Sequence, residues 1–248
     1  MRKVYSLLIL AGFVLAVSGC NSNGGADAGS PSAMPNASGP AQPAAVAPSS
    51  ATDSSPAQDV PRSHDSRLLL VCFGDSLTAG AGTDPGQSFP DYLQVDLDKL
   101  HYRYRVDNEG VSGNTTKDGV ERLPEIVALH PSVAIVEFGG NDGLRGLRIE
   151  DTRANLDEIV GTLKKAGIKV ALAGITLPPD YGQDYILKFN ETYRLIASKY
   201  HVPMLPFLLK NVYGVPGMMQ ADKIHATAKG NVIVARNVVP LVVPLLKK

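Results

Sequence analysis

The sequence has no excess of charge of either sign. Its 248 residues carry 24 Lys and Arg side chains and 24 Asp and Glu side chains, which gives a formal net charge of zero. A protein without net charge does not attract nucleic acid or an anionic surface by its overall charge, so we expect no nucleic-acid partner. The hydrophobic content of 44% is enough for a packed core, and the length allows one large domain or two small ones.

The N-terminal apolar run is too short to span a membrane comfortably, and no stop-transfer pattern follows it. Arg2 and Lys3 precede this run at residues 7–17, and small residues follow it up to Cys20. A charged region, an apolar region and a small-residue cleavage site in this order are typical of an export signal. Residues 17–20, Val-Ser-Gly-Cys, also resemble the lipobox of bacterial lipoproteins, whose cysteine is lipidated and becomes the mature N-terminus.

This resemblance implies an exported protein that is anchored to the membrane of the cell envelope through lipid on Cys20. Asn21 stands where an Asp is associated with inner-membrane retention, so the outer membrane is favoured over the inner one. The alternative is an ordinary cleaved signal peptide in which Cys20 is incidental. Cys72 is the only other cysteine, so a lipidated Cys20 leaves no disulfide framework. Because Cys72 lies in an apolar run, we expect an inert buried thiol there and not a nucleophile.

Large apolar side chains are almost absent from residues 21–66, which contain seven prolines among Ala, Ser, Gly and Asn. Such a segment cannot bury enough surface to offset the entropy of ordering it. We therefore expect a signal peptide at residues 1–19, the lipidated cysteine and a disordered tether at residues 20–66, and one folded domain at residues 67–248.

From residue 67 onward, short apolar runs alternate with amphipathic stretches. The expected strands are residues 68–73, 104–108, 133–138, 169–175 and 203–206. The expected helices are residues 89–100, 115–129 with an interruption near Pro124, 151–166, 183–200 and 227–243. This alternation predicts an α/β fold with three α/β/α layers, in which a parallel five-stranded sheet is covered by helices on both faces. A flavodoxin-like strand order, 2-1-3-4-5, would place the binding crevice beyond the carboxyl ends of the first and third strands.

Glycine and small polar residues follow each of the first three predicted strands. They are residues 74–76 (Gly-Asp-Ser), 110–115 (Gly-Val-Ser-Gly-Asn-Thr) and 139–142 (Gly-Gly-Asn-Asp). Loops of this fold often have such residues simply to turn the chain, so one of them would mean little. Three that are directed at the same crevice indicate a site.

A histidine before the last predicted helix supplies a base for this site. Of the five histidines, His225 alone is placed to reach the crevice; the others lie in the tether or before strands, at the opposite edge of the sheet: His64, His101, His130 and His201. A serine hydroxyl needs a neighbouring base to act as a nucleophile, and that base needs an acceptor that fixes its tautomer. Ser76, His225 and Asp222 fill these three roles.

Four short blocks, in order along the chain, resemble those of the SGNH, or GDSL, hydrolases. They are residues 74–77 (Gly-Asp-Ser-Leu), 113–115 (Gly-Asn-Thr), 140–142 (Gly-Asn-Asp) and 222–225 (Asp-x-x-His), and the resemblance covers residues 68–248. Residues 140–146 and 177–182 are similar to the bacterial thioesterase, lysophospholipase and arylesterase branch of this family. The chain has no G-x-S-x-G motif, which argues against the α/β-hydrolase fold.

The resemblance implies a role for each matching residue. Ser76 would be the nucleophile, His225 the general base and then the general acid, and Asp222 the acceptor that orients His225. The oxyanion hole would consist of the backbone N–H groups of Ser76 and Gly113 with the side-chain amide of Asn141. No metal and no cofactor are expected.

The sequence departs from the family pattern at two positions close to His225. Lys223 and Ala226 stand where the family commonly has Gly and Pro, so we expect a loop that is more mobile than usual and an added positive charge near the mouth of the site. Asp75 and Asp142 flank the site, and loop hydrogen bonding is favoured over metal binding for both. Met218, Met219 and the leucines of residues 144–147 are candidates for an acyl groove or for ordinary packing: the sequence does not distinguish these.

The favoured function is that of a monomeric serine esterase that hydrolyses small-molecule carboxylic esters or thioesters with short-to-medium acyl chains, lysolipids included. The first alternative, suggested by the tether and the compartment, is an esterase that removes O-acetyl groups from cell-wall material or polysaccharide. The second is a lipid-anchored binding protein built on a hydrolase scaffold, against which the complete set of catalytic residues counts strongly.

Overall fold

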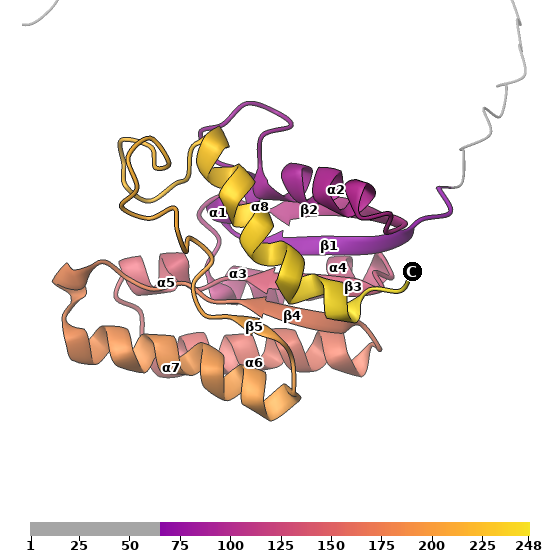
Figure 1. Cartoon of the computed structure of the whole chain (residues 1–248). Coiled ribbons are helices and arrows are strands. Elements are labelled where there is room, and N and C mark those ends of the chain that lie inside the picture. The colour runs from indigo at the N-terminus through magenta and orange to yellow at the C-terminus, as the bar shows by residue number, and fades with distance from the viewer. Residues whose placement is uncertain (1–64) are drawn as a thin grey trace, which may run out of the picture. The chain divides into compact units, whose positions relative to one another are not determined.

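A five-stranded parallel sheet forms the centre of the computed structural model, which describes residues 65–248 (Figure 1). The strands are β1 (Leu68–Gly74), β2 (Tyr104–Gly110), β3 (Val133–Glu137), β4 (Lys169–Ala173) and β5 (Met204–Leu205). Their order in the sheet is β2-β1-β3-β4-β5, and each neighbouring pair is parallel. The predicted fold class and strand order are therefore confirmed. The predicted signal peptide, Cys20 and nearly all of the predicted tether lie outside the described residues.

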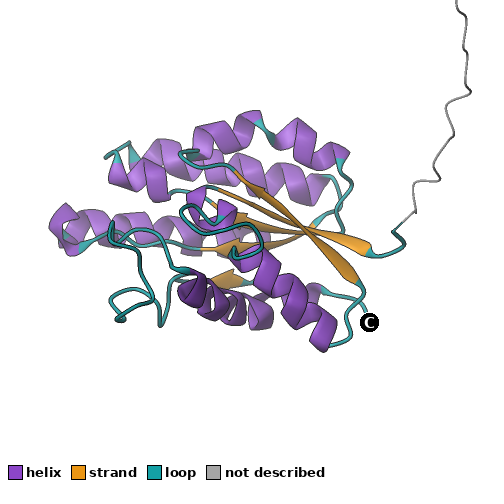
Figure 2. Ribbon diagram, turned by 90° about the horizontal axis from the view of Figure 1, so that it is seen from above, coloured by secondary structure: helices purple, strands orange, loops and turns teal. Residues whose placement is uncertain are grey.

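Helices cover both faces of this sheet, as Figure 2 shows from above. The α-helices are α1 (Ser76–Ala79), α2 (Phe89–Lys99), α3 (Thr116–Glu121), α4 (Leu123–Ala128), α5 (Gly140–Leu144), α6 (Ile149–Lys165), α7 (Gln183–Tyr200) and α8 (Ala228–Val242), and two short 3₁₀ helices are η1 (Pro179–Tyr181) and η2 (Val243–Leu245). The short helices α1 and α5 directly follow β1 and β3, and both were expected to be loops.

The two faces of the sheet pack against separate sets of helices, because side chains alternate along each strand. Val71 and Phe73 of β1 belong to a buried cluster that includes side chains of α4, α6 and α7. Leu70 and Cys72 point to the other face and belong to a cluster with side chains of α2 and α8. Figure 1 shows the same division, with α2 and α8 on one side of the sheet and α6 and α7 on the other. Cys72 is buried as predicted, and its burial raises the pKa of the thiol.

One element boundary differs from the sequence-based prediction in a way that matters for the site, whereas the predicted break in a helix is confirmed. The interruption predicted near Pro124 falls at Arg122, because Pro124 has no N–H and fits best in the first turn of a new helix, α4. Strand β4 ends at Ala173, two residues earlier than predicted. A Cβ atom at Gly174 would lie 2.8 Å from the carbonyl oxygen of Pro206, so a glycine is needed where the chain leaves the sheet. Ile175 is thereby released from the strand.

The histidines that sequence reasoning placed away from the site do lie at the amino edge of the sheet. His101, His130 and His201 each end a helix and precede a strand, and their backbones are left-handed, with φ of 61°, 50° and 50°. Residues at this edge cannot reach the carboxyl ends of the strands, so His225 remains the histidine of interest.

Candidate active site

Residues from four parts of the chain line one cleft at the carboxyl edge of the sheet. Ser76 follows β1, Gly113 follows β2, Asn141 follows β3 and His225 precedes α8, and all four line the same cleft. The strand order reverses at β1, which has β2 on one side and β3 on the other. The cleft therefore lies where an open parallel sheet commonly binds its ligands.

Ser76 is held at the first position of helix α1 by the residues around it. Asp75 caps this helix, and its Oδ1 accepts a hydrogen bond from the backbone N–H of Leu77 at 3.0 Å. Gly74 lets β1 end close against β3, since a Cβ atom at this position would lie 2.6 Å from the carbonyl oxygen of Glu137. The change from strand to helix within two residues leaves the Ser76 hydroxyl facing the cleft.

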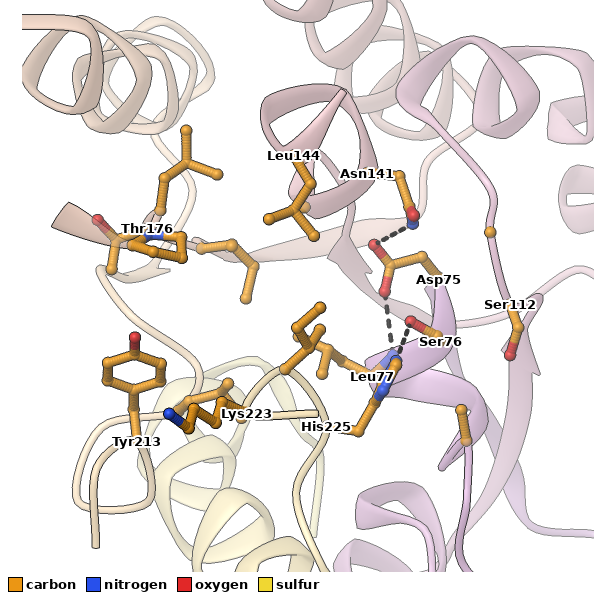
Figure 3. Close-up of a pocket in the computed structure, with 18 of the residues that line it drawn as sticks. Asp75, Ser76, Leu77, Ser112, Asn141, Leu144, Thr176, Tyr213, Lys223 and His225 are labelled. Atoms are coloured by element: carbon orange, nitrogen blue, oxygen red, sulfur yellow. Dashed lines mark hydrogen bonds between the residues drawn. The ribbon is translucent and has the colours of Figure 1, made fainter. Parts of the chain in front are cut away.

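Ser76, His225 and Asp222 form a continuous hydrogen-bonded chain. The Oγ of Ser76 lies 2.8 Å from Nε2 of His225, and Nδ1 of His225 lies 2.6 Å from Oδ2 of Asp222 (Figure 3 shows the serine–histidine contact). Burial raises the pKa of Asp222, but hydrogen bonds from the His225 ring and from the backbone of Ile224 and His225 outweigh this and lower the pKa to about 2. A charged Asp222 holds the proton of a neutral His225 on Nδ1, which leaves Nε2 free to accept the Ser76 proton.

The loop that carries Asp222 and His225 is tied to the rest of the domain through Gln220, which sequence reasoning missed. The side-chain Nε2 of Gln220 donates to the carbonyl oxygens of Ala81, at 2.7 Å, and Ala226, at 2.9 Å. Its backbone N–H donates to the carbonyl oxygen of His225 at 2.8 Å. Ala226, which replaces the proline common in the family, is buried and forms an antiparallel bridge with Met219. These contacts fix the position of the His225 backbone without a proline.

Gly113 and Asn141 are held at the other side of Ser76. The Nδ2 of Asn141 donates to Oδ2 of Asp75 at 3.2 Å and to the carbonyl oxygen of Asn114 at 2.9 Å, which orients the amide group. Gly113 has a left-handed backbone with φ of 85°, and its carbonyl oxygen accepts a hydrogen bond from Arg145 at 2.9 Å. A glycine is therefore required at this position for its conformation, in addition to the space that it leaves at the cleft.

Glu137, a fully buried carboxyl group beneath Ser76, was also missed by sequence reasoning. Its Oε2 accepts hydrogen bonds from the hydroxyl of Thr78 at 2.7 Å and from the backbone N–H of Asp75 at 3.4 Å. Its Oε1 is buried and has no hydrogen-bond partner among residues 65–248. Burial, and then the charge of Asp75, raise the pKa of Glu137 well above its usual value, and burial raises the pKa of Asp75 to about 6. Burial therefore favours the neutral, protonated form of Glu137.

This raised pKa predicts that stability falls as the pH rises. Between the ordinary pKa of glutamate and its raised value in the protein, the folded state holds a proton that the unfolded state has released. The free energy of unfolding should thus decrease by about 1.4 kcal/mol for each pH unit within this window from this group alone. Replacement of Glu137 by Gln keeps a neutral group of the same shape, so urea unfolding of E137Q between pH 5 and 7 should show a flatter pH dependence than the wild type.

The matched control is the E191Q variant, in which the glutamate is an exposed residue of α7. E191Q should keep the wild-type pH dependence of unfolding, because the exposed side chain of Glu191 is in contact with water in both the folded and the unfolded protein. Equal slopes for E137Q and the wild type would contradict a proton on Glu137 in the folded protein.

Asp142 has a role in fixing loops, as the sequence indicated. Its Oδ2 accepts the backbone N–H of Thr116 at 2.9 Å, and its Oδ1 accepts the hydroxyl groups of Thr116 and, at 3.3 Å, of Thr152. The buried carboxylate therefore joins α5 to α3 and α6. Within the described residues, no group of three or more His, Cys, Asp and Glu side chains is arranged to hold a metal ion.

The cleft next to Ser76 is apolar along most of its walls and has a volume of about 260 Å³. Of the residues considered for an acyl groove, Leu144 lines the cleft, whereas Met218 and Met219 pack against the core on the α8 side. Leu177, Pro178 and Ile224, from segments that the family resemblance covers, line it as well, and the rest of the apolar lining comes from segments that sequence reasoning did not connect with the site: Ile175, Phe207, Leu209 and Tyr213. These side chains make the cleft suited to a hydrophobic ligand.

Comparison with known proteins identifies the family. A model of the GDSL-like Lipase/Acylhydrolase family matches residues 72–233. The chain belongs to this family. Esterase TesA of Pseudomonas aeruginosa is 40% identical to this acylhydrolase over 178 residues, which are 71% of this chain and 89% of TesA. Thioesterase 1/protease 1/lysophospholipase L1 of Escherichia coli K12 is 38% identical over 157 residues, which are 63% of this chain and 74% of the relative.

Further relatives and solved structures agree with this family assignment. An arylesterase of Vibrio mimicus is 35% identical over 164 residues, 66% of this acylhydrolase and 82% of the relative. A crystal structure of TesA has a TM-score of 0.70 at 40% identity and covers 72% of this chain and 100% of that one. The psychrotrophic esterase EstA from Pseudoalteromonas, in a structure inhibited by monoethylphosphonate, has a TM-score of 0.67 at 25% identity. The match covers 70% of this chain and 96% of EstA. The predicted enzyme class is confirmed: this acylhydrolase is a carboxylic ester hydrolase.

Proposed function

We propose that Ser76 is the nucleophile of this esterase, with His225 as its base and Asp222 as the group that orients the base. The observation that carries this proposal is the 2.8 Å contact between Ser76 Oγ and His225 Nε2 at the wall of an apolar cleft. As the Ser76 oxygen bonds to the carbonyl carbon of the ester, its proton passes to Nε2 of His225. The imidazolium ion that forms is stabilised by the charged carboxylate of Asp222.

The oxyanion that forms in this step would be held by Asn141 and two backbone N–H groups, those of Ser76 and Gly113. In the free enzyme, the longer of the two Asn141 hydrogen bonds goes to Asp75, at 3.2 Å. We propose that this N–H is the one that turns to the substrate oxygen, while the 2.9 Å bond to Asn114 keeps the amide in place. A donor that is already oriented costs little reorganisation when the charge develops.

His225 completes the reaction by returning its proton. When the tetrahedral intermediate collapses, Nε2 of His225 donates the proton to the leaving oxygen or sulfur, and the acyl group stays on Ser76. His225 then removes a proton from a water molecule, whose oxygen attacks the acyl carbon. When this second tetrahedral intermediate collapses, the bond from the acyl carbon to Ser76 breaks, His225 returns the proton to the Ser76 oxygen, and the free acid leaves. Because the same proton transfer serves an oxygen or a sulfur leaving atom, thioesters should also be hydrolysed.

The acyl chain of the substrate is proposed to be short to medium in length. The cleft volume of about 260 Å³ lies just below the range of about 300–1,000 Å³ that is typical of small-molecule sites. Each methylene that it buries contributes about 0.8 kcal/mol, so kcat/KM should rise about fourfold per methylene until the cleft is full. Rates with p-nitrophenyl esters from acetyl to palmitoyl, measured beside an acetylated glycan, test this.

We expect the maximum of kcat/KM between the butanoyl and decanoyl esters and a low rate with palmitoyl. If the acetyl ester or the acetylated glycan were the best substrate and every longer chain were rejected, the O-acetyl esterase alternative would replace this proposal. Leu177 offers an internal check, because it lines the cleft and has no part in the proposed proton transfers. The L177A variant enlarges the cleft, so it should move the maximum toward longer chains and leave the acetyl rate nearly unchanged.

The enzyme is further proposed to be exported and anchored to the membrane of the cell envelope through lipid on Cys20. Residues 17–20 and the proline-rich segment after them support this proposal. The two or three acyl chains of a lipoprotein cysteine bind a membrane firmly, whereas a single chain binds only marginally. In cell fractionation, we expect the wild type in the membrane fraction and the C20A variant in the soluble fraction. Equal release of both proteins would reject the anchor.

A further inference from the structure

Lys223 is a charged residue on the wall of the apolar cleft, in the loop that carries Asp222 and His225. In Figure 3, its amine lies near Tyr213, on the side of the cleft away from Ser76. Both residues line the same cleft as Ser76. The reacting hydroxyl and the lysine amine therefore lie at different ends of one ligand site.

The backbone of Lys223 gives no structural reason for a lysine. Its φ is 58°, in the left-handed region that favours glycine and strains a long side chain. Its backbone N–H donates to the carbonyl oxygen of Gln220 at 3.1 Å, a bond that a glycine would make equally well. A strained residue beside an active site points to a function for its side chain.

The charge of Lys223 is not used by the fold. Among the described residues, no carboxylate forms an ion pair with its amine. Asp75, the acid that lines the cleft, is buried and accepts hydrogen bonds from Leu77 and Asn141. An ammonium group without an internal partner, at the end of an apolar cleft, is suited to bind an anion supplied by the ligand.

The walls of the cleft are mostly apolar. Ile175, Leu177, Phe207 and Ile224 line the same cleft, and Tyr213 and Thr176 add hydroxyl groups to the lining. A ligand that matches this sequence of surfaces has an ester carbonyl group, then a short aliphatic chain, then an anionic group. The substrate chemistry that fits is an ester whose acyl chain ends in a carboxylate or a similar anion.

We propose that Lys223 is a specificity-determining residue that binds an anionic group at the far end of the acyl chain. The proposal rests on the function proposed above, in which the acyl chain occupies the cleft. Lys223 would act on substrate binding and not on bond breaking, since its amine lies on the side of the cleft away from Ser76. Its contribution should appear in KM and not in kcat, and high salt should weaken it because the amine is solvent-accessible.

The test compares two substrates of equal chain length on the full chain: p-nitrophenyl hexanoate, which is neutral, and the p-nitrophenyl monoester of adipic acid, whose acyl chain ends in a carboxylate. The ratio of their kcat/KM values, anionic over neutral, is the readout. We expect K223M to lower this ratio by about fivefold, mainly through a higher KM for the adipate ester, and to leave the hexanoate rate nearly unchanged. K223R should keep the ratio, and molar salt should lower it in the wild type.

The K223G variant separates this role from a structural one. It removes the strain of the left-handed backbone together with the amine, so it should unfold at a higher temperature than the wild type and still lose the preference. A ratio that stays the same in K223M and K223G would overturn the proposal. So would an effect confined to substrates with an anionic leaving group, such as the hexanoyl ester of p-hydroxybenzoate. A wild type that cleaves neither ester would overturn the proposed function, and this inference with it.

Discussion

Replacement of Ser76 by alanine is expected to lower kcat by about 10⁵- to 10⁶-fold while the protein stays folded. The hydroxyl forms the bond to the substrate carbon, and alanine offers no atom that can replace it. A small residual rate should remain, because the oxyanion donors and the cleft still bind the substrate. The measurement is kcat with a p-nitrophenyl ester of medium chain length, beside thermal unfolding of both proteins.

Ser112 provides the matched control for this variant. It is a second serine that lines the cleft, in the loop after β2, and no histidine is hydrogen-bonded to it in the described structure. S112A should keep nearly the wild-type kcat. A large loss of rate in S112A, or near-normal activity in S76A, would contradict the assignment of Ser76.

Replacement of Asn141 by alanine is expected to lower kcat by about 10²- to 10³-fold, with little change in KM. The Nδ2 group of Asn141 is proposed to bind the oxygen only when it carries the charge of the transition state. Removal of such a donor raises the barrier without weakening the binding of the neutral ester. Steady-state kinetics of N141A over a wide range of substrate concentration separates the two constants.

The control for N141A is N114A. The side chain of Asn114 accepts a hydrogen bond from Arg122 at 3.0 Å and does not line the cleft, although its backbone oxygen accepts from Asn141. N114A should therefore keep its kcat even if it loses some stability. A rise in KM without a fall in kcat in N141A would point to substrate positioning in place of oxyanion binding.

Much of the fold could be predicted because its signals are local. The strands of a sheet covered on both faces are continuous apolar runs, and β1 and β3 are of this kind. Helix α7 was predicted within its observed limits because its apolar residues recur with the helical period over Gln183–Tyr200. Helices α1 and α5 have four and five residues, too few for a period to be visible, so they were missed.

The residues that approach Ser76 could be located because strand ends are predictable. Once β1, β2 and β3 were placed, the residues after them had to meet at one edge of a parallel sheet. Glu137 could not be found in this way. Its raised pKa results from its burial beside Asp75, which the sequence alone does not show. The one available signal was an acid at the last position of a buried strand.

The lining of the cleft was the least predictable part. Ile175, Phe207 and Tyr213 lie in loops after β4 and β5, and nothing in their local sequence connects them with Ser76. Their proximity results from the path of the chain across the sheet and from the early end of β4 at Ala173. Substrate preference depends on such residues, so the sequence predicted the substrate less closely than it predicted the type of reaction.

The most direct test of this account is to identify the atom that reacts with a fluorophosphonate. Such a reagent forms a stable adduct with an activated serine, and the modified residue can be read from the peptide masses. The account predicts a single adduct on Ser76, formed by the wild type and by S112A and absent from S76A. An adduct on any other residue, or none in an active enzyme, would contradict the central claim that Ser76 is the nucleophile.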